Sequence, residues 1–83
     1  MKINSKQLND FPLNTLGKIV DYDNQDLQMP SKIIEMGLLP NTEFRILHQA
    51  PFGGPLYIEF GKEKSKIALR TEEAKYIIVQ SID

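Results

Sequence analysis

Few side chains in this sequence are of the types that carry out chemistry. Cysteine is absent, and His48 is the only histidine among the 83 residues. Without thiolates there can be no disulfide, no thiolate metal site and no thiol nucleophile. His48 could be a single metal ligand or a general base. Because no second His or Cys is present to complete such a site, we favour a structural or surface role for it.

The carboxylates lack the spacing of a reactive or metal-binding site. Asp21, Asp23 and Asp26 have the alternation of a calcium loop, but its glycine and its bidentate glutamate are missing. A solvated loop is the better interpretation. Glu72 and Glu73 could be paired for acid–base chemistry, but neighbours on a helical turn point about 100° apart. We interpret them as acidic residues that suit a helix N-terminus. The sequence therefore predicts no catalytic residue, no metal site and no cofactor.

The basic residues do not indicate a nucleic-acid partner. Lys62, Lys64 and Lys66 alternate and could hold a phosphate, but lysines at such a hairpin more often protect a sheet edge from pairing. The chain has 10 Lys and Arg against 11 Asp and Glu, a formal net charge of −1. Since nucleic-acid binding depends on neutralising phosphates with cations, we expect no nucleic-acid partner.

The length allows one domain, residues 1–83, with a thin core. Apolar residues make up 41% of the chain, which argues against disorder. No apolar run approaches the roughly 18–20 residues that span a bilayer, and no secretory signal is recognisable. We therefore expect a cytoplasmic protein without direct membrane insertion. So small a core must be packed well or supported by a partner, which favours a binding or regulatory module.

The elements that must position these side chains are mainly strands. Period-two alternation and β-branched residues predict five of them, at residues 17–22, 44–48, 56–60, 66–70 and 76–79. In the second strand the alternation places Phe44, Ile46 and His48 on one face. Five short strands with one helix indicate a small, partly closed barrel.

The one helix is predicted at residues 29–36, after the first strand. Pro30 suits its first turn, where no N–H is needed. Gly37 supplies the left-handed residue that ends many helices, and Leu38 and Leu39, which follow immediately, are placed to fold back on the last turn in the Schellman manner.

Two single helical turns are also predicted. One runs from Ser5, its N-cap, to Phe11, and the other covers residues 71–74 with Thr71 as N-cap.

Four segments, in order and at similar spacings, resemble the FeoA family and cover about residues 8–80. They are Gly17–Val20, Ile34–Thr42, Ala50–Pro55 and Ile67–Ala74. The resemblance implies a mainly β (α+β) fold, a small SH3-like five-stranded β-barrel with one helix inserted after the first strand.

The same resemblance implies a function. It predicts a non-catalytic accessory or regulatory protein of Fe²⁺ uptake that acts by contact with the cytoplasmic GTPase part of the membrane transporter FeoB. Such a protein would be recruited to the inner face of the membrane and could associate weakly with itself. Because the same barrel ends the DtxR-type repressors, the alternative is a regulatory domain that senses metal or binds a proline-rich segment.

The chain departs from the family pattern in three respects. Asn41 stands where the family usually has glycine after the helix, and Asn14 where it often has glycine before the first strand. Asparagine tolerates a left-handed backbone better than other non-glycine residues, so we expect the turn at Asn41 to survive. The family's helix tends to be arginine-rich, whereas Lys32 is the one basic residue here.

Apolar residues in loops are the candidate partner-binding residues. These are Leu38, Leu39, Pro40 and Phe52. An exposed cluster of such residues would mark a protein-binding site. The alternative is that Leu38 or Leu39 caps the small core beneath the helix.

Overall fold

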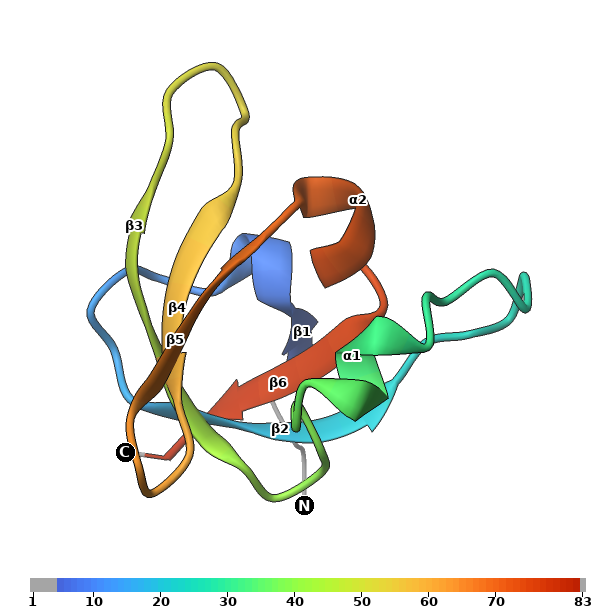
Figure 1. Cartoon of the computed structure of the whole chain (residues 1–83), viewed down its shortest axis with the longest axis horizontal. Helices are drawn as coiled ribbons and strands as arrows, with labels where there is room; N and C mark the ends of the chain where they lie inside the picture. The colour runs from blue at the N-terminus through green and yellow to red at the C-terminus, as the bar shows by residue number, and fades with distance from the viewer. Residues whose placement is uncertain (1–4, 83) are drawn as a thin grey trace.

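The computed structural model describes residues 5–82, which form one antiparallel sheet with two short helices (Figure 1). The strands are β1 (Ser5–Gln7), β2 (Gly17–Tyr22), β3 (Glu43–Gln49), β4 (Leu56–Phe60), β5 (Ser65–Leu69) and β6 (Ile77–Ser81). The helices are α1 (Lys32–Glu35) and α2 (Thr71–Ala74), and a 3₁₀ turn, η1, spans Leu8–Asp10. The strand order is β1-β6-β2-β3-β4-β5. None of the helices between residues 5 and 82 has the length and apolar character needed to cross a bilayer.

All five predicted strands are present, but the sheet has six strands rather than five, and the start of the predicted helical turn at residues 5–11 is the additional strand. Ser5 is not an N-cap; it begins β1, in which Lys6 pairs with Val79 of β6. The turn itself is confined to η1. A strand of three polar residues has no apolar alternation, so its structure depends on β6, more than 70 positions away, which local patterns do not reveal.

A bulge in β3 reverses the expected direction of His48. Ile46 pairs with Ile58 and His48 with the next residue back, Tyr57, so Leu47 is an extra residue in the strand. Phe44 and Ile46 are buried as predicted, whereas His48 lies on the exposed face. Its ring stacks on that of Tyr57, with 4.4 Å between centroids. The prediction that His48 shares a face with Phe44 and Ile46 is therefore wrong.

The core is a single apolar cluster in which Gly17 permits a close approach. A Cβ at Gly17 would lie 2.7 Å from Cζ of Phe11 and 2.9 Å from Phe44. These two rings pack at a tilt, 5.1 Å apart between centroids. The buried apolar residues are Leu8, Phe11, Ile19, Ile33, Leu38, Phe44, Ile46, Leu56, Ile58, Phe60, Leu69, Ala74, Tyr76, Ile77 and Val79.

Helix α1 is shorter than predicted but ends as expected. Gly37 has φ +97°, the N–H of Leu38 bonds to the carbonyl of Ile33, and the N–H of Gly37 bonds to that of Ile34. These are the two hydrogen bonds of a Schellman motif. The motif turns the chain sharply, so the residues that follow α1 reach the core at once.

Asparagine adopts the left-handed conformation at both positions where the family has glycine. Asn41 has φ +74° and Asn14 has φ +56°. The N–H of Asn41 donates to the carbonyl of Ile19, so the turn is tied to β2. The expectation that the turn survives the replacement of glycine is confirmed.

Candidate partner-binding surface

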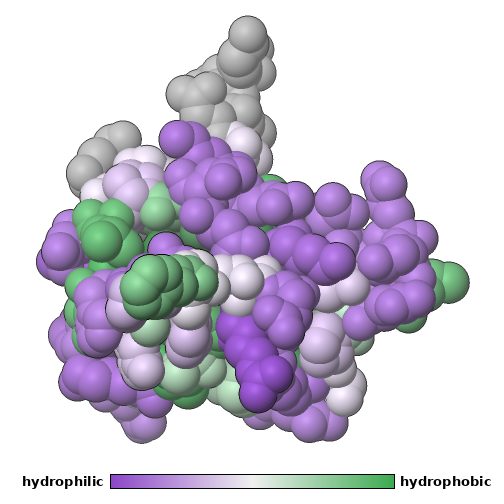
Figure 2. All heavy atoms as spheres, turned by 90° about the horizontal axis from the view of Figure 1, so that it is seen from above, coloured by the Kyte–Doolittle hydropathy of each residue, from purple (hydrophilic) through white to green (hydrophobic). Residues whose placement is uncertain are grey.

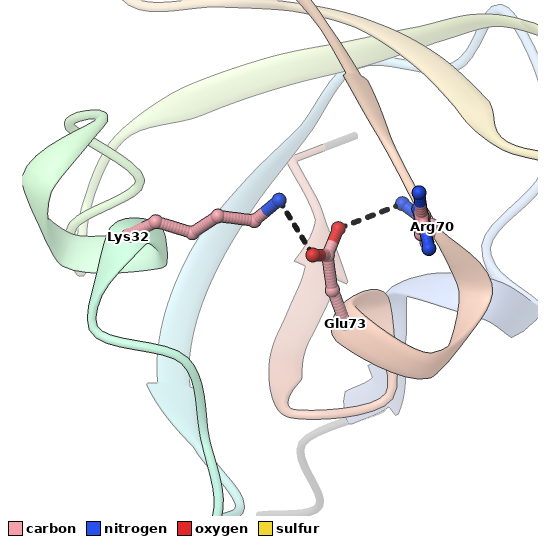
Figure 3. A network of polar contacts seen from close by, with 3 residues as sticks. All are labelled: Lys32, Arg70 and Glu73. Atoms are coloured by element: carbon pink, nitrogen blue, oxygen red, sulfur yellow. Dashed lines mark hydrogen bonds and ion pairs between the residues drawn. The ribbon is translucent and has the colours of Figure 1, made fainter.

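A buried carboxylate joins the two helices (Figure 3). Glu73 of α2 accepts the Lys32 ammonium of α1 at 2.5 Å on Oε2, and the backbone N–H of Arg70 at 3.0 Å on Oε1. Burial raises the pKa of Glu73, but hydrogen bonds from Lys32 and the Arg70 N–H, with the charges of both residues, outweigh it. The pKa therefore lies below its ordinary value of 4.5. This contact holds α1, and with it the turn that follows, against α2.

The start of α2 differs from the prediction in one residue. Arg70, not Thr71, is the N-cap, and Thr71 is the first helical residue. The N–H of Arg70 is satisfied by the carboxylate of Glu73, three positions on, so this side chain contributes to the structure of the helix start.

Replacing Glu73 by glutamine is expected to lower the free energy of unfolding by about 1–2 kcal/mol at pH 7, since it removes charge-assisted bonds from a buried group. Because the folded-state pKa of Glu73 is lowered, its stabilisation is present above pH 4.5 and is lost as the pH falls through the folded-state value. Urea unfolding followed by circular dichroism at several pH values measures both effects.

The exposed neighbour Glu72 provides the matched control. Its carboxylate makes no hydrogen bond or ion pair within residues 5–82, so Glu72→Gln should keep the wild-type profile. The interpretation is refuted if Glu73→Gln and wild type lose stability equally as the medium is acidified.

The turn after α1 separates the predicted partner residues. Leu38 is 1% exposed and lies in the core, and its carbonyl accepts the hydroxyl of Tyr22 at 2.7 Å. Leu38 is thus the residue that caps the core, which corrects its place in an exposed cluster. Leu39 is 45% exposed, and Pro40 is also exposed. Ile34 of α1 is exposed as well.

The loop between β3 and β4 presents Phe52 to solvent. The phenylalanine is fully exposed and has φ +61°, a left-handed conformation that bulky residues seldom adopt. The loop closes through hydrogen bonds from the N–H of Ala50 to Pro55 O (3.0 Å) and from Gln49 Nε2 to Gly54 O (3.1 Å). Its conformation is therefore fixed by the chain itself.

The structure does not bring Phe52 and the Leu39–Pro40 turn together. The turn precedes β3 and the loop follows it, at opposite ends of the molecule in Figure 1. Since β3 has seven residues, about 20 Å separates its ends. The expected cluster is therefore two separate surfaces.

From above, most of the surface is hydrophilic, and hydrophobic residues form separate spots (Figure 2). Among residues 5–82 the large apolar side chains that are exposed are Leu13, Leu27, Ile34, Leu39, Phe52, Tyr57 and Ile82. The sequence patterns do not single out Leu27, at 84% the most exposed of them after Phe52. Its one signal is an isolated apolar residue in a polar loop.

The histidine, carboxylates and lysines singled out in the sequence lie as follows. Within residues 5–82 no three His, Asp or Glu side chains are placed to hold a metal ion. Of the three alternating lysines, Lys66 forms an ion pair with Glu59 across the β4–β5 pair, with 3.5 Å between Nζ and Oε2. Lys62 and Lys64 are exposed.

These features define a small β-rich domain of SH3-like fold with apolar side chains exposed in its loops. The chain belongs to the FeoA domain family, whose family model matches residues 6–81. This family is tied to ferrous iron transport. Among curated proteins, none matches the sequence significantly.

Solved structures show the same fold. A crystal structure of an iron uptake regulatory protein (FeoA) is 23% identical, with a TM-score of 0.74 over 94% of this chain and 97% of that one. The NMR structure of a FeoA-like protein from Clostridium acetobutylicum is 26% identical, with a TM-score of 0.79 over 100% and 92%. A manganese-dependent transcriptional repressor is 20% identical, with a TM-score of 0.82 over 99% of this chain, which spans only 44% of the repressor.

Proposed function

We propose that the protein is a non-catalytic accessory factor of Fe²⁺ uptake that binds the cytoplasmic GTPase part of a FeoB-type transporter. It would act from the cytoplasm, recruited to the inner face of the membrane. The match to the FeoA domain over residues 6–81 supports a role in Fe²⁺ uptake. The likeness to SH3-like domains supports closure of the sheet into the family's barrel.

The exposure of Phe52 is the observation that supports a contact with the transporter. An apolar ring held in solvent at a left-handed position costs free energy twice, in the backbone and in hydration. A partner that buries the ring recovers the second cost. The fixed loop also avoids the entropy of ordering this contact on binding.

Replacing Phe52 by alanine is expected to weaken binding to the purified GTPase part of the transporter by about tenfold to a hundredfold, because burying an aromatic side chain contributes that much. Isothermal titration calorimetry measures the affinity. Urea unfolding should show a stability within about 0.5 kcal/mol of wild type, since the ring has no intramolecular packing to lose.

The control for this variant is Leu13→Ala, which removes another exposed apolar side chain from a different loop. It should bind as wild type does. If wild-type protein shows no binding to the transporter, the proposed function is wrong. If Phe52→Ala binds as tightly as wild type, the loop is not the contact.

A second function is favoured by one observation, the TM-scores of 0.82 and 0.83 to manganese-dependent transcriptional repressors. We propose as the alternative a regulatory domain that senses a divalent metal or binds a proline-rich segment. Of the three tyrosines a proline groove would need, Tyr76 is buried and Tyr22 donates to Leu38, which leaves Tyr57 exposed beside His48. Heat on titration with Fe²⁺, Mn²⁺ or a proline-rich peptide, without transporter binding, would support this alternative.

A further inference from the structure

The loop between β2 and α1 holds a leucine where the backbone favours glycine or asparagine. Leu27 has φ +57° and is 84% exposed. A left-handed conformation costs a bulky residue roughly 1–2 kcal/mol, and the exposed side chain contributes no packing in return. Glycine or asparagine would close the same turn at lower cost. Because Leu27 does not stabilise the fold, contact with another molecule explains this residue better.

The conformation of this loop is fixed from within. Four hydrogen bonds hold the residues around Leu27: Leu27 N–H to Asn24 O (3.0 Å), Gln28 N–H to Asp26 Oδ1 (3.1 Å), Met29 N–H to Asn24 Oδ1 (3.0 Å) and Tyr76 O–H to Asp26 Oδ2 (3.1 Å). The last bond ties the loop to the residue just before β6. A side chain displayed on such a support binds without first having to be ordered.

The surroundings of Leu27 are acidic. Asp21, Asp23 and Asp26 are exposed on the segment that leads to it, and the Lys75 ammonium lies beside Asp23 and Asp26, 5.0 Å above the centre of the Tyr76 ring. A hollow of about 250 Å³ opens next to the loop. Its lining residues are Gln7, Asp23, Gln25, Asp26, Lys75 and Tyr76. The carboxylates alone define no site. They make this protein's surface next to Leu27 negatively charged, so a partner that binds there is expected to be positively charged.

The loop is accessible in both views. It is the segment that projects furthest to the right in Figure 1, away from the β3–β4 loop, and Figure 2 shows hydrophobic atoms at the right-hand edge of a hydrophilic surface. It is therefore a different surface from the one that carries Phe52.

We propose that Leu27 is a second anchor, which enters an apolar pocket of a partner protein whose rim carries lysine or arginine. One of these cations enters the hollow between Asp23 and Asp26. The inference rests on the proposed function and assigns this pocket to the transporter's cytoplasmic part. A protein surface fits better than a membrane, because anionic headgroups would repel the exposed carboxylates of Asp23 and Asp26 on the same loop.

The variant Leu27→Asn separates binding from folding, because the two effects have opposite signs. Asparagine suits φ +57°, so the midpoint of thermal unfolding should rise by roughly 2–5 °C. The affinity for the purified GTPase part of the transporter should fall by about tenfold to a hundredfold. A leucine with only a structural role would change the midpoint and leave the affinity unaltered.

A second variant tests the charge of the rim. The Asp23 carboxylate accepts no hydrogen bond within residues 5–82, so Asp23→Asn removes a charge without breaking a contact. Binding should weaken by about threefold at low salt, and the difference should vanish near 0.5 M salt, where exposed charges are screened. The control Leu13→Asn should leave the affinity unchanged.

The binding measurements distinguish failure of this inference from failure of the proposed function. If wild type does not bind the transporter, this inference falls together with the proposed function. If wild type binds and Phe52→Ala weakens binding while Leu27→Asn does not, the inference alone is overturned. Sedimentation of wild type with phosphatidylethanolamine–phosphatidylglycerol vesicles, abolished by Leu27→Asn, would also overturn it by identifying a lipid surface instead.

Discussion

Replacing Leu38 by alanine is expected to lower the free energy of unfolding by about 3 kcal/mol, within the 2–5 kcal/mol typical of buried leucines. Leu38 is 1% exposed, so its truncation leaves a cavity beneath the turn that ends α1. A domain of this length has a total stability of about 4–12 kcal/mol. The variant should therefore unfold at a much lower urea concentration, as circular dichroism would show.

The affinity of the folded variant for the transporter should stay close to that of wild type, because the Leu38 side chain reaches no partner. Leu39→Ala, one residue away and 45% exposed, is the matched comparison. It should change stability by less than about 0.5 kcal/mol and weaken binding if the turn is a contact. Equal stability of Leu38→Ala and Leu39→Ala would contradict the placement of these two side chains.

Introducing valine at Gly17 is expected to destabilise the fold by about 3 kcal/mol or more, the upper range for overpacked cores. The Cβ would lie 2.7 Å from Phe11 and 2.9 Å from Phe44, closer than carbon atoms can approach without a shift of the rings. The rings are buried, and Gly17 lies in β2 opposite Phe44 in β3, so neither side can yield freely. Urea unfolding measures the loss.

A double-mutant cycle tests the cause. Gly17→Ala adds the clashing Cβ alone, and Phe11→Leu removes the ring atom nearest to it. The combined loss of stability should be smaller than the sum of the two single losses, by an amount within the 0.5–3 kcal/mol range of couplings between contacting residues. Strict additivity would show that the destabilisation comes from another source, such as the backbone of β2.

The sequence was sufficient for the strands whose apolar residues alternate. In β4 the period of two places Leu56, Ile58 and Phe60 inside and Tyr57 outside, as the structure has them. It was insufficient for β1, whose residues Ser5–Gln7 are all exposed, and for the bulge at Leu47. Both depend on pairing with distant strands, so a local pattern contains no trace of them.

The candidate binding residues were predictable by type but not by position. Leu38 and Leu39 are the same residue in adjacent places, and the Schellman turn decides that the first is buried and the second exposed. The sequence patterns did not identify Leu27, because an isolated apolar residue in a loop belongs to no periodic pattern. The sign of its φ angle, which marks it, exists only in three dimensions.

Strand β3 has a consequence for how the protein selects among partners. It separates the turn that carries Leu39, which precedes it, from the loop that carries Phe52, which follows it. Two weak contacts on a rigid body reinforce each other only where the partner presents both receptors at the matching separation. A surface with a single apolar pocket would gain only one of the two contacts. The protein would then discriminate among partners by the distance between their two receptor sites, which must match the separation that β3 imposes.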